Sequence, residues 1–513
     1  MKKRLFNIHK FIGVNVLLFF FISLFFGILT IFQPYVNTWE DSKQHVNDIK
    51  ISDIDLDKCL KQITKRTYFG EDGKKVRNDI ISLSFPSIEV SATNLIRVRN
   101  RPNFYLDPNT CKRVRPKNFK ISQFFDKMHT GGLFNSLLVK ILFGFMSVAV
   151  VFLCFSGILL IIKNKYSNKK TKSNKAFYAK YHRLLFFYTL PLIFMFGITG
   201  ALFNLGLYSS PLLTHYLTKG ETLNALQTKR NILFDPALKN MDLSKKIKSI
   251  SVNELYTKAT QEFDDISFYK MEIYNYNDIN SRVKFIGYEP KNFFISSMTN
   301  ESYIILDGTN AKVLEKKIAD DGTFAEKTLD AIFYLHYLRT FSDLPRIIFA
   351  FISISILIGL VFAMSLWLER AKKDKFSYKV LKPLSFTIIL GSLISSSFLF
   401  ASVWLIPKSA VFYSFMGERY STQETLFYLC FLVLLAVILF KKDLFKITKY
   451  TCYLSSVFLI CAVISHEFFS GYSFIRLYQE GLIQILASDI ILLLVAALLI
   501  FTGKKLPKKY FEF

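Results

Sequence analysis

Long apolar segments alternate with polar stretches along this chain. Four uncharged segments are each long enough to cross the ~30 Å hydrocarbon layer of a membrane as a helix. They are residues 11–32, 141–162, 184–207 and 347–368. Weaker apolar candidates follow at residues 384–406, 425–440, 450–465 and 482–501. The pattern predicts a polytopic α-helical membrane protein with about eight transmembrane helices.

The first segment follows Lys2, Lys3 and Arg4, as a secretory signal would. Its apolar run is longer than the roughly 7–15 residues of a signal peptide, and no small-residue cleavage site follows it. We therefore expect residues 11–32 to be a retained anchor.

Basic residues gather in the short connections between segments, which accounts for much of the net charge of +27. Seven lysines lie between Lys163 and Lys180. Further clusters fall at Arg370–Lys382, Lys441–Lys449 and Lys504–Lys509. Cytoplasmic loops are enriched in Lys and Arg, and these connections share one side if every segment spans. We expect a multi-pass protein of a bacterial inner (cytoplasmic) membrane with both termini cytoplasmic, and no nucleic-acid partner.

Histidines mark the first four apolar segments in a pattern that occurs twice. His9 and His182 immediately precede the first and third segments, and each has a glycine eighteen residues later. His129 and His336 stand twelve and eleven residues ahead of the second and fourth segments. Residues 1–165 and 170–370 therefore form two copies of span, outer domain, span.

Alternate spans run in opposite directions, so His9 and His182 are predicted to meet near the inner face and His129 and His336 near the outer face. Neutral imidazole is a good iron ligand, and haem iron offers two axial positions. A helical bundle can hold such a group between facing helices. The pattern predicts two bis-histidine haems, with these four residues as their ligands.

Cationic side chains near each pair are candidate partners for haem propionates, although membrane anchoring explains each one equally well. They are Lys10 and Arg183 inside, and Lys127, Lys140, Arg339 and Arg346 outside. The apolar stretch 133–139 is expected to extend the second span outward toward His129. His336 is separated from its span by Pro345 and charged residues, so the outer haem is expected to be partly exposed beneath the outer domains.

The two polar insertions are expected to be α+β domains with similar endings. Residues 103–110 and 303–310 each pair an apolar strand with Asp-Pro or Asp-Gly, a hairpin signature. Cys59 and Cys111 both lie in the first insertion, and whether they form a disulfide stays open.

The chain resembles the PepSY-associated transmembrane family over about residues 1–370. The resemblance rests on His9, Met128-His129, His182-Arg183 with Thr199-Gly200, and Leu335-His336 with Trp367 and Arg370. It departs at Phe26-Gly27, at Met128 and at Asn135-Ser136, where the family usually has Thr-Gly, Leu and glycines. The outer insertions look like PepSY-type modules.

The resemblance implies a role in iron acquisition, because some members look like di-haem reductases of ferric siderophores in the inner membrane. The expected cofactors are two haem b groups, and the expected substrate is a ferric siderophore or other Fe(III) complex. No glycine-rich dinucleotide fingerprint occurs, so the electron donor is expected to be a cytoplasmic protein or a membrane quinol. A transporter of iron complex or haem, and a PepSY-type regulator without redox activity, are the alternatives.

The last four spans contain no second histidine with which to complete another haem pair. His466 and Glu467 end the seventh span, and Asp489 lies within the eighth. The acid either makes a polar contact between helices or transfers protons at a quinol site.

We expect seven regions along the chain. These are helix 1 (1–32), a PepSY-like outer domain (33–128), helix 2 (129–165), a basic loop with helix 3 (166–207), a second outer domain (208–335), helix 4 (336–370) and a four-helix region (371–513).

Overall fold

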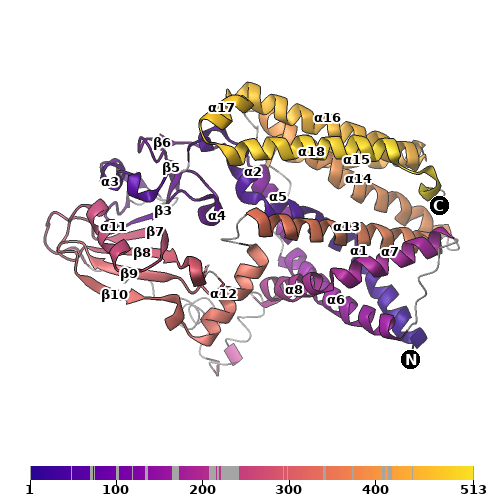
Figure 1. The fold of residues 1–513 in the computed structure, drawn as a ribbon, viewed down its shortest axis with the longest axis horizontal. Helices are drawn as coiled ribbons and strands as arrows, with labels where there is room; N and C mark the ends of the chain where they lie inside the picture. The colour runs from indigo at the N-terminus through magenta and orange to yellow at the C-terminus, as the bar shows by residue number, and fades with distance from the viewer. Residues whose placement is uncertain are drawn as a thin grey trace.

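A computed structural model gives the fold of most of the chain (Figure 1). It describes residues 2–511 except for 48, 70–72, 74, 100–102, 118, 133–136, 164–172, 207–214, 217–218, 221–241, 293, 297, 339–342, 372–374, 407–410, 414–418 and 442.

Seven straight helices among the described residues are long and apolar enough to span a membrane. They are α1 (Lys2–Ile31), α6 (Leu137–Ile162), α13 (Asp343–Ala371), α14 (Lys375–Leu405), α15 (Thr422–Lys441), α16 (Leu444–Ser470) and α18 (Ile483–Lys505). They pack into one bundle (Figure 1). The predicted class, a polytopic helical membrane protein, is confirmed.

The expectation of one continuous third span over residues 184–207 is wrong. The segment consists of α7 (Asn174–Tyr188) and α8 (Leu190–Ala201), which meet at a 70° bend. Proline in the first turn of α8 lacks an N–H and its ring excludes the carbonyl four residues earlier, so the helix cannot continue. A π-helical turn, η4 (Leu202–Gly206), follows α8. Counted as one broken span, the pair brings the total to the eight expected.

Both polar insertions contribute to one antiparallel sheet of eight strands, in the order β10-β9-β8-β7-β3-β4-β5-β6. The first insertion supplies β3 (Ile81–Ser84), β4 (Ile96–Val98), β5 (Phe104–Leu106) and β6 (Arg113–Val114). The second supplies β7 (Ser267–Tyr274), β8 (Arg282–Tyr288), β9 (Ser302–Asp307) and β10 (Val313–Lys317). The first strands of the two repeats, β3 and β7, pair at the centre, with Ile81 opposite Ile273. The duplicated domains are therefore fused through their equivalent edges.

Two equivalent helices supply apolar side chains to the main core of the sheet. They are α3 (Leu56–Thr64) and α11 (Val252–Gln261), and their side chains pack with inward-facing residues such as Leu83 and Phe285. Alternate positions are buried in β4 and β5, whereas β8 and β9 are buried along nearly their whole length, because a second apolar cluster that includes Ile286 and Ile305 forms on their other face. The predicted hairpin turns follow β5 and β9, where the Asp107 and Asp307 carboxylates accept backbone N–H groups two residues later.

Shorter elements complete the fold. They are α2 (Gln33–Trp39), α4 (Ile88–Ser91), α5 (Ile121–Thr130), α12 (Phe324–Tyr337), α17 (Phe474–Gln479), the hairpins β1 (Tyr68–Phe69) with β2 (Lys75–Val76) and β11 (Val411–Tyr413) with β12 (Arg419–Ser421), and short 3-10 turns.

The expectation that the second span extends outward to His129 is wrong. His129 lies on α5, which ends at Gly131 in a left-handed cap, and α6 begins at Leu137.

The sheet lies at one end of the helical bundle, and both chain termini lie at the opposite end (Figure 1). This arrangement agrees with two insertions on one side of a membrane and both termini on the other.

Cys59 on α3 and Cys111 after β5 form a disulfide, which settles the question left open by the sequence. Both cysteines are fully buried in the core beneath the sheet. The bond closes a loop across 52 positions of the chain and so restricts the unfolded state of the first repeat.

Replacing both cysteines by serine is expected to destabilise the outer domain by about 2–4 kcal/mol, because the unfolded chain regains the freedom of that loop. Thermal or urea unfolding of the full-length protein in detergent measures the loss. Cys461→Ser, which removes a free cysteine on α16, is the matched control. Equal stability of the double variant and the control would contradict a structural role for the bond.

Candidate functional site

The structure brings His129 and His336 together, as the sequence predicted. Their ring centroids are 6.2 Å apart and the ring planes are inclined by 31°. An imidazole nitrogen binds a metal at about 2 Å, with the ring centre roughly 1 Å beyond, so two rings on opposite sides of one iron stand about 6 Å apart. The separation therefore fits two axial ligands of one haem.

Hydrogen bonds from the neighbouring helices fix the orientation of both rings. His129 Nδ1 lies 2.8 Å from the Ser23 carbonyl on α1, and His336 Nδ1 lies 2.7 Å from Thr199 Oγ1 on α8. The Thr199 hydroxyl donates to the Met195 carbonyl, so it accepts from His336. With the proton on Nδ1, each Nε2 carries the lone pair that a metal needs.

The repeated glycines give the outer rings room. A Cβ atom at Gly27 would lie 3.0 Å from His129 Nδ1. At Gly200 a Cβ atom would lie 3.0 Å from Ser147 Oγ and 3.9 Å from His336 Cε1. Gly27, eighteen residues after His9, therefore packs against His129. Gly200, eighteen residues after His182, packs near His336.

The inner pair, His9 and His182, lines a second cavity among α1, α6, α7 and α13. His9 Nδ1 lies 2.7 Å from Ser156 Oγ, and His182 Nδ1 lies 3.5 Å from the Gly359 carbonyl. Both partners lie on the facing spans, α6 and α13. At both sites, therefore, the Nδ1 atom of each histidine contacts a group on a neighbouring helix.

The two cavities follow one another along the bundle. Phe20, Val150 and Ile193 line both, so these three side chains form the wall between them. The inner cavity faces the first half of α1, and the outer cavity faces its second half and the helix α12. The two histidine pairs therefore lie at different levels of the bundle, His9 and His182 at one and His129 and His336 at the other.

The cationic candidates divide by position. Lys10 and Arg183 line the inner cavity, together with Arg370, which the sequence analysis did not single out for this role. Lys140 lines the outer cavity, whereas Lys127 is exposed and does not. Arg346 is wrong as a propionate partner, because it is buried and donates to the Ile31 carbonyl at 2.7 Å. Arg339 lies outside the described residues.

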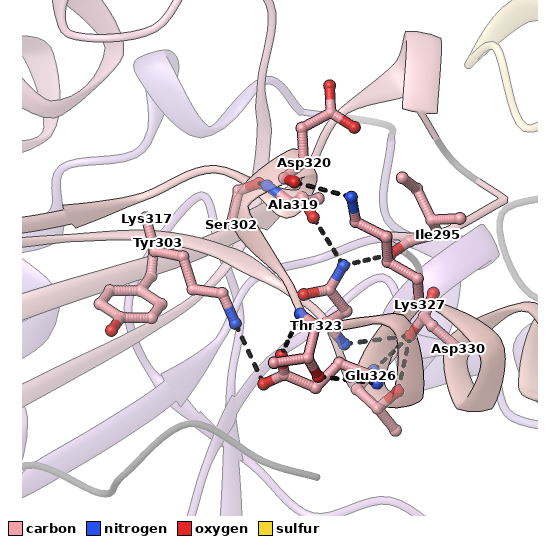
Figure 2. Close-up of polar contacts among 12 residues, drawn as sticks. Ile295, Ser302, Tyr303, Lys317, Ala319, Asp320, Thr323, Glu326, Lys327 and Asp330 are labelled. Atoms are coloured by element: carbon pink, nitrogen blue, oxygen red, sulfur yellow. Dashed lines mark hydrogen bonds and ion pairs between the residues drawn. The ribbon is translucent and has the colours of Figure 1, made fainter. Parts of the chain in front are cut away.

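A polar network fixes α12, the helix that carries His336, to the second outer domain (Figure 2). The first turn has a capping box, in which Thr323 and Glu326 each accept the other's backbone N–H. The buried Asp330 carboxylate accepts backbone N–H groups of Met298, Thr299 and Asn300. Two lysines add cross-links, from Lys317 to Glu326 and from Lys327 to the Asp320 carbonyl. The network holds the first half of α12 against the second outer domain, and so positions His336 at the other end of that helix.

Burial lowers the pKa of His336 to about 3, and the adjacent His129 acts in the same direction. The imidazole is therefore neutral at physiological pH, which is the form that binds iron. His129 contacts α1 at the level of Ser23, eight residues before the end of that helix.

These features define a polytopic membrane protein built on a duplicated span–sheet–span unit with paired histidines. The model of the PepSY-associated TM region matches residues 6–370, and the chain belongs to this family. A comparison with curated proteins finds no match.

A third polar cluster was only partly foreseen. Asp489 and His466 contact each other within the bundle, and His45, from the connection after α2, packs beside them. His45 lies 421 positions from His466, and no local pattern marks it as a partner.

Replacing Asp330 by alanine is expected to cost about 2–4 kcal/mol, because it leaves several buried N–H groups without an acceptor. Glu326→Ala, which removes the capping-box carboxylate and the partner of Lys317, is expected to cost about 1 kcal/mol. Thermal unfolding of both full-length variants tests the difference. Equal losses would show that Asp330 does not dominate the attachment of α12.

Proposed function

We propose that this protein is an integral-membrane di-haem electron-transfer protein that reduces extracytoplasmic ferric iron, bound as a siderophore complex. The observation that supports this most strongly is the 6.2 Å separation of the His129 and His336 rings. Their Nδ1 atoms are already bound by α1 and α8, which leaves the Nε2 atoms for iron. His9 and His182 line the other cavity together, and a neighbouring helix contacts the Nδ1 atom of each.

The residues present fit two haem b groups. His129 with His336, and His9 with His182, would supply the axial nitrogens, and bound haem would supply a one-electron carrier at each site. Mostly apolar side chains line both cavities, with Phe20 in each and Phe196 in the outer one. Lys10, Arg183 and Arg370 would bind the carboxylates of the inner group, and Lys140 those of the outer.

The proposed orientation places the sheet outside an inner (cytoplasmic) membrane and both termini inside. It is supported by the basic short connections and by the position of the termini at the bundle end far from the sheet (Figure 1). Moving an electron outward across a membrane that is negative inside is favoured by about 2.3 kcal/mol per 100 mV. Electrons from a cytoplasmic donor or a membrane quinol would then reach a ferric complex beneath the outer domains.

One observation favours a second candidate function. The 70° bend between α7 and α8 is the interrupted span expected of a transporter, in which half-helix ends line a transport site. The bend lies next to the cavity residues Leu190 and Ile193. A transporter of iron complex or haem would move its cargo without holding two stable haems. A PepSY-type regulator without redox activity would hold none.

Purified protein is expected to bind two haems per chain and to show sharp low-spin bands in the dithionite-reduced spectrum. His9→Ala or His182→Ala should remove the inner haem, and His129→Ala or His336→Ala the outer, leaving about one haem in each case. Haem content per chain and difference spectra measure this. A folded, colourless wild-type protein would contradict the proposed function.

Gly27→Ala is expected to weaken retention of the outer haem by about 10- to 100-fold, because the new methyl group displaces the His129 ring from its hydrogen bond. Gly206→Ala is the matched control, since a Cβ atom there has no neighbour within 4 Å. Haem loss to an excess of apomyoglobin gives the comparison. If both variants lose haem at the wild-type rate, the glycine does not shape the site.

A further inference from the structure

A buried polar cluster joins the duplicated half of the chain to the C-terminal helices. The Asp489 carboxylate on α18 accepts from Trp39 Nε1 at 2.7 Å and lies 2.8 Å from His466 Nδ1 on α16. His45 stands edge-on to His466, with ring centroids 5.2 Å apart, and Trp404 of α14 lies 4.9 Å from His466. Each of these five side chains is at most 5% exposed.

Several ring nitrogens in this cluster make no hydrogen bond within the described part of the chain. They are His466 Nε2, Trp404 Nε1 and at least one nitrogen of His45, the other approaching the Trp39 backbone. A buried polar group without a partner costs about 1–3 kcal/mol, so a concentration of them indicates a site for something that completes the hydrogen bonds. These atoms include donors and acceptors, on rings that pack edge-on or tilted against one another.

The surrounding charge argues against a metal ion. Lys117 Nζ lies 3.8 Å from the centre of the Trp404 ring and donates to the Val403 carbonyl. An ammonium group so close repels a second cation and stabilises a ligand that becomes negative. No group of three His, Cys, Asp or Glu side chains among the described residues is arranged to hold a metal. A neutral, hydrogen-bonding organic molecule fits better.

The cluster lies toward the bundle end that faces the sheet. His466 is in the last two turns of α16, and Asp489 is in the second turn of α18. At that depth a molecule dissolved in the bilayer can present hydroxyl groups to polar side chains while its apolar part stays in lipid. The half-buried Tyr472, whose ring meets His45 edge-on at 4.9 Å, covers the cluster and would have to move for entry.

Packed aromatic rings connect the cluster to the outer histidine pair. Trp39 contacts Phe400 at 5.8 Å, and Phe400 contacts Phe125 at 5.6 Å. Phe125 and His129 lie one turn apart on the same face of α5. A continuous series of van der Waals contacts therefore leads from the polar cluster to the outer site.

We propose that the cluster of His45, His466 and Asp489 binds and oxidises a lipid-soluble hydroquinone, the electron donor for the proposed function on which this inference rests. The two O–H bonds of the hydroquinone break in turn, and His466 Nε2 takes each proton and releases it to the aqueous side that faces the sheet, while His45 hydrogen-bonds the ring oxygen. Two electrons leave singly, and bound ferric haem would accept them, one at each histidine pair. The quinone then departs.

The geometry gives each residue a distinct task. Asp489 orients His466 through Nδ1 and stabilises the imidazolium that forms, as a carboxylate does behind any general-base histidine. Lys117 stabilises the anion left after the first proton departs. Trp39 fixes the carboxylate from the side of the duplicated repeat.

Binding can be measured without haem, because two of the three tryptophans in the chain, Trp39 and Trp404, lie in the cluster. A short-chain benzoquinone is expected to quench the fluorescence of full-length Trp367→Phe protein saturably. In that background, His466→Gln and Asp489→Asn should each weaken half-saturation at least tenfold. Ser488→Ala, one residue from the carboxylate, is the matched control and should bind normally.

The same quenching is expected in protein that lacks the outer haem through His129→Ala and His336→Ala. In holoprotein, anaerobic mixing with the short-chain hydroquinone should reduce haem at least tenfold more slowly in Asp489→Asn than in Ser488→Ala. Dithionite should still reduce the haem of both variants fully.

Saturable quenching that is unchanged by His466→Gln and by Asp489→Asn, or the absence of quenching, would overturn the hydroquinone site. The di-haem proposal would be unaffected by either result. Quenching with equal haem-reduction rates in the two variants would overturn the oxidation step. Wild-type protein that contains no haem would contradict the proposed function. It would also contradict hydroquinone oxidation, because that step needs haem as the electron acceptor.

Discussion

The hydrogen bond on Nδ1 of each paired histidine is the interaction on which the arrangement of the site depends. An imidazole among apolar helices needs a partner for its N–H, and each of these four finds one on a neighbouring helix: Ser23 or Ser156 on the spans of the first repeat, and Thr199 or Gly359 on those of the second. The same contact fixes the helix packing and the direction of Nε2. Helix association and ligand geometry are therefore set together.

The sequence was sufficient to predict the spans and the histidine pairs, because both follow from periodic signals: apolar length, and a spacing that occurs twice. It failed at Thr189–Pro191, where one proline outweighs an otherwise unbroken apolar run, and at Gly131, where a left-handed cap separates α5 from α6. His45 was missed because the rings it contacts come from residues more than 350 positions away. Contacts of that kind leave no local pattern.

The C-terminal helices gain a structural role from the buried contacts around Trp39. Asp489 was weighed as a polar contact between helices, and it is one, since it binds both the neighbouring α16 and the helix that follows the first span. The large fully buried side chains Trp39, Phe26 and Phe427 belong to the same apolar cluster. The last four helices are thus packed into the duplicated unit and are not a separate body.

The pairing of β3 with β7 bears on how such a chain arose. A single ancestral copy of span, sheet and span would have carried one four-stranded sheet with its first strand exposed at the edge. Two copies pairing through that edge form a symmetric dimer, in which each histidine pair draws one imidazole from either subunit. Fusion of the two genes would then have preserved a geometry that separate polypeptides had already assembled, and freed each half to diverge.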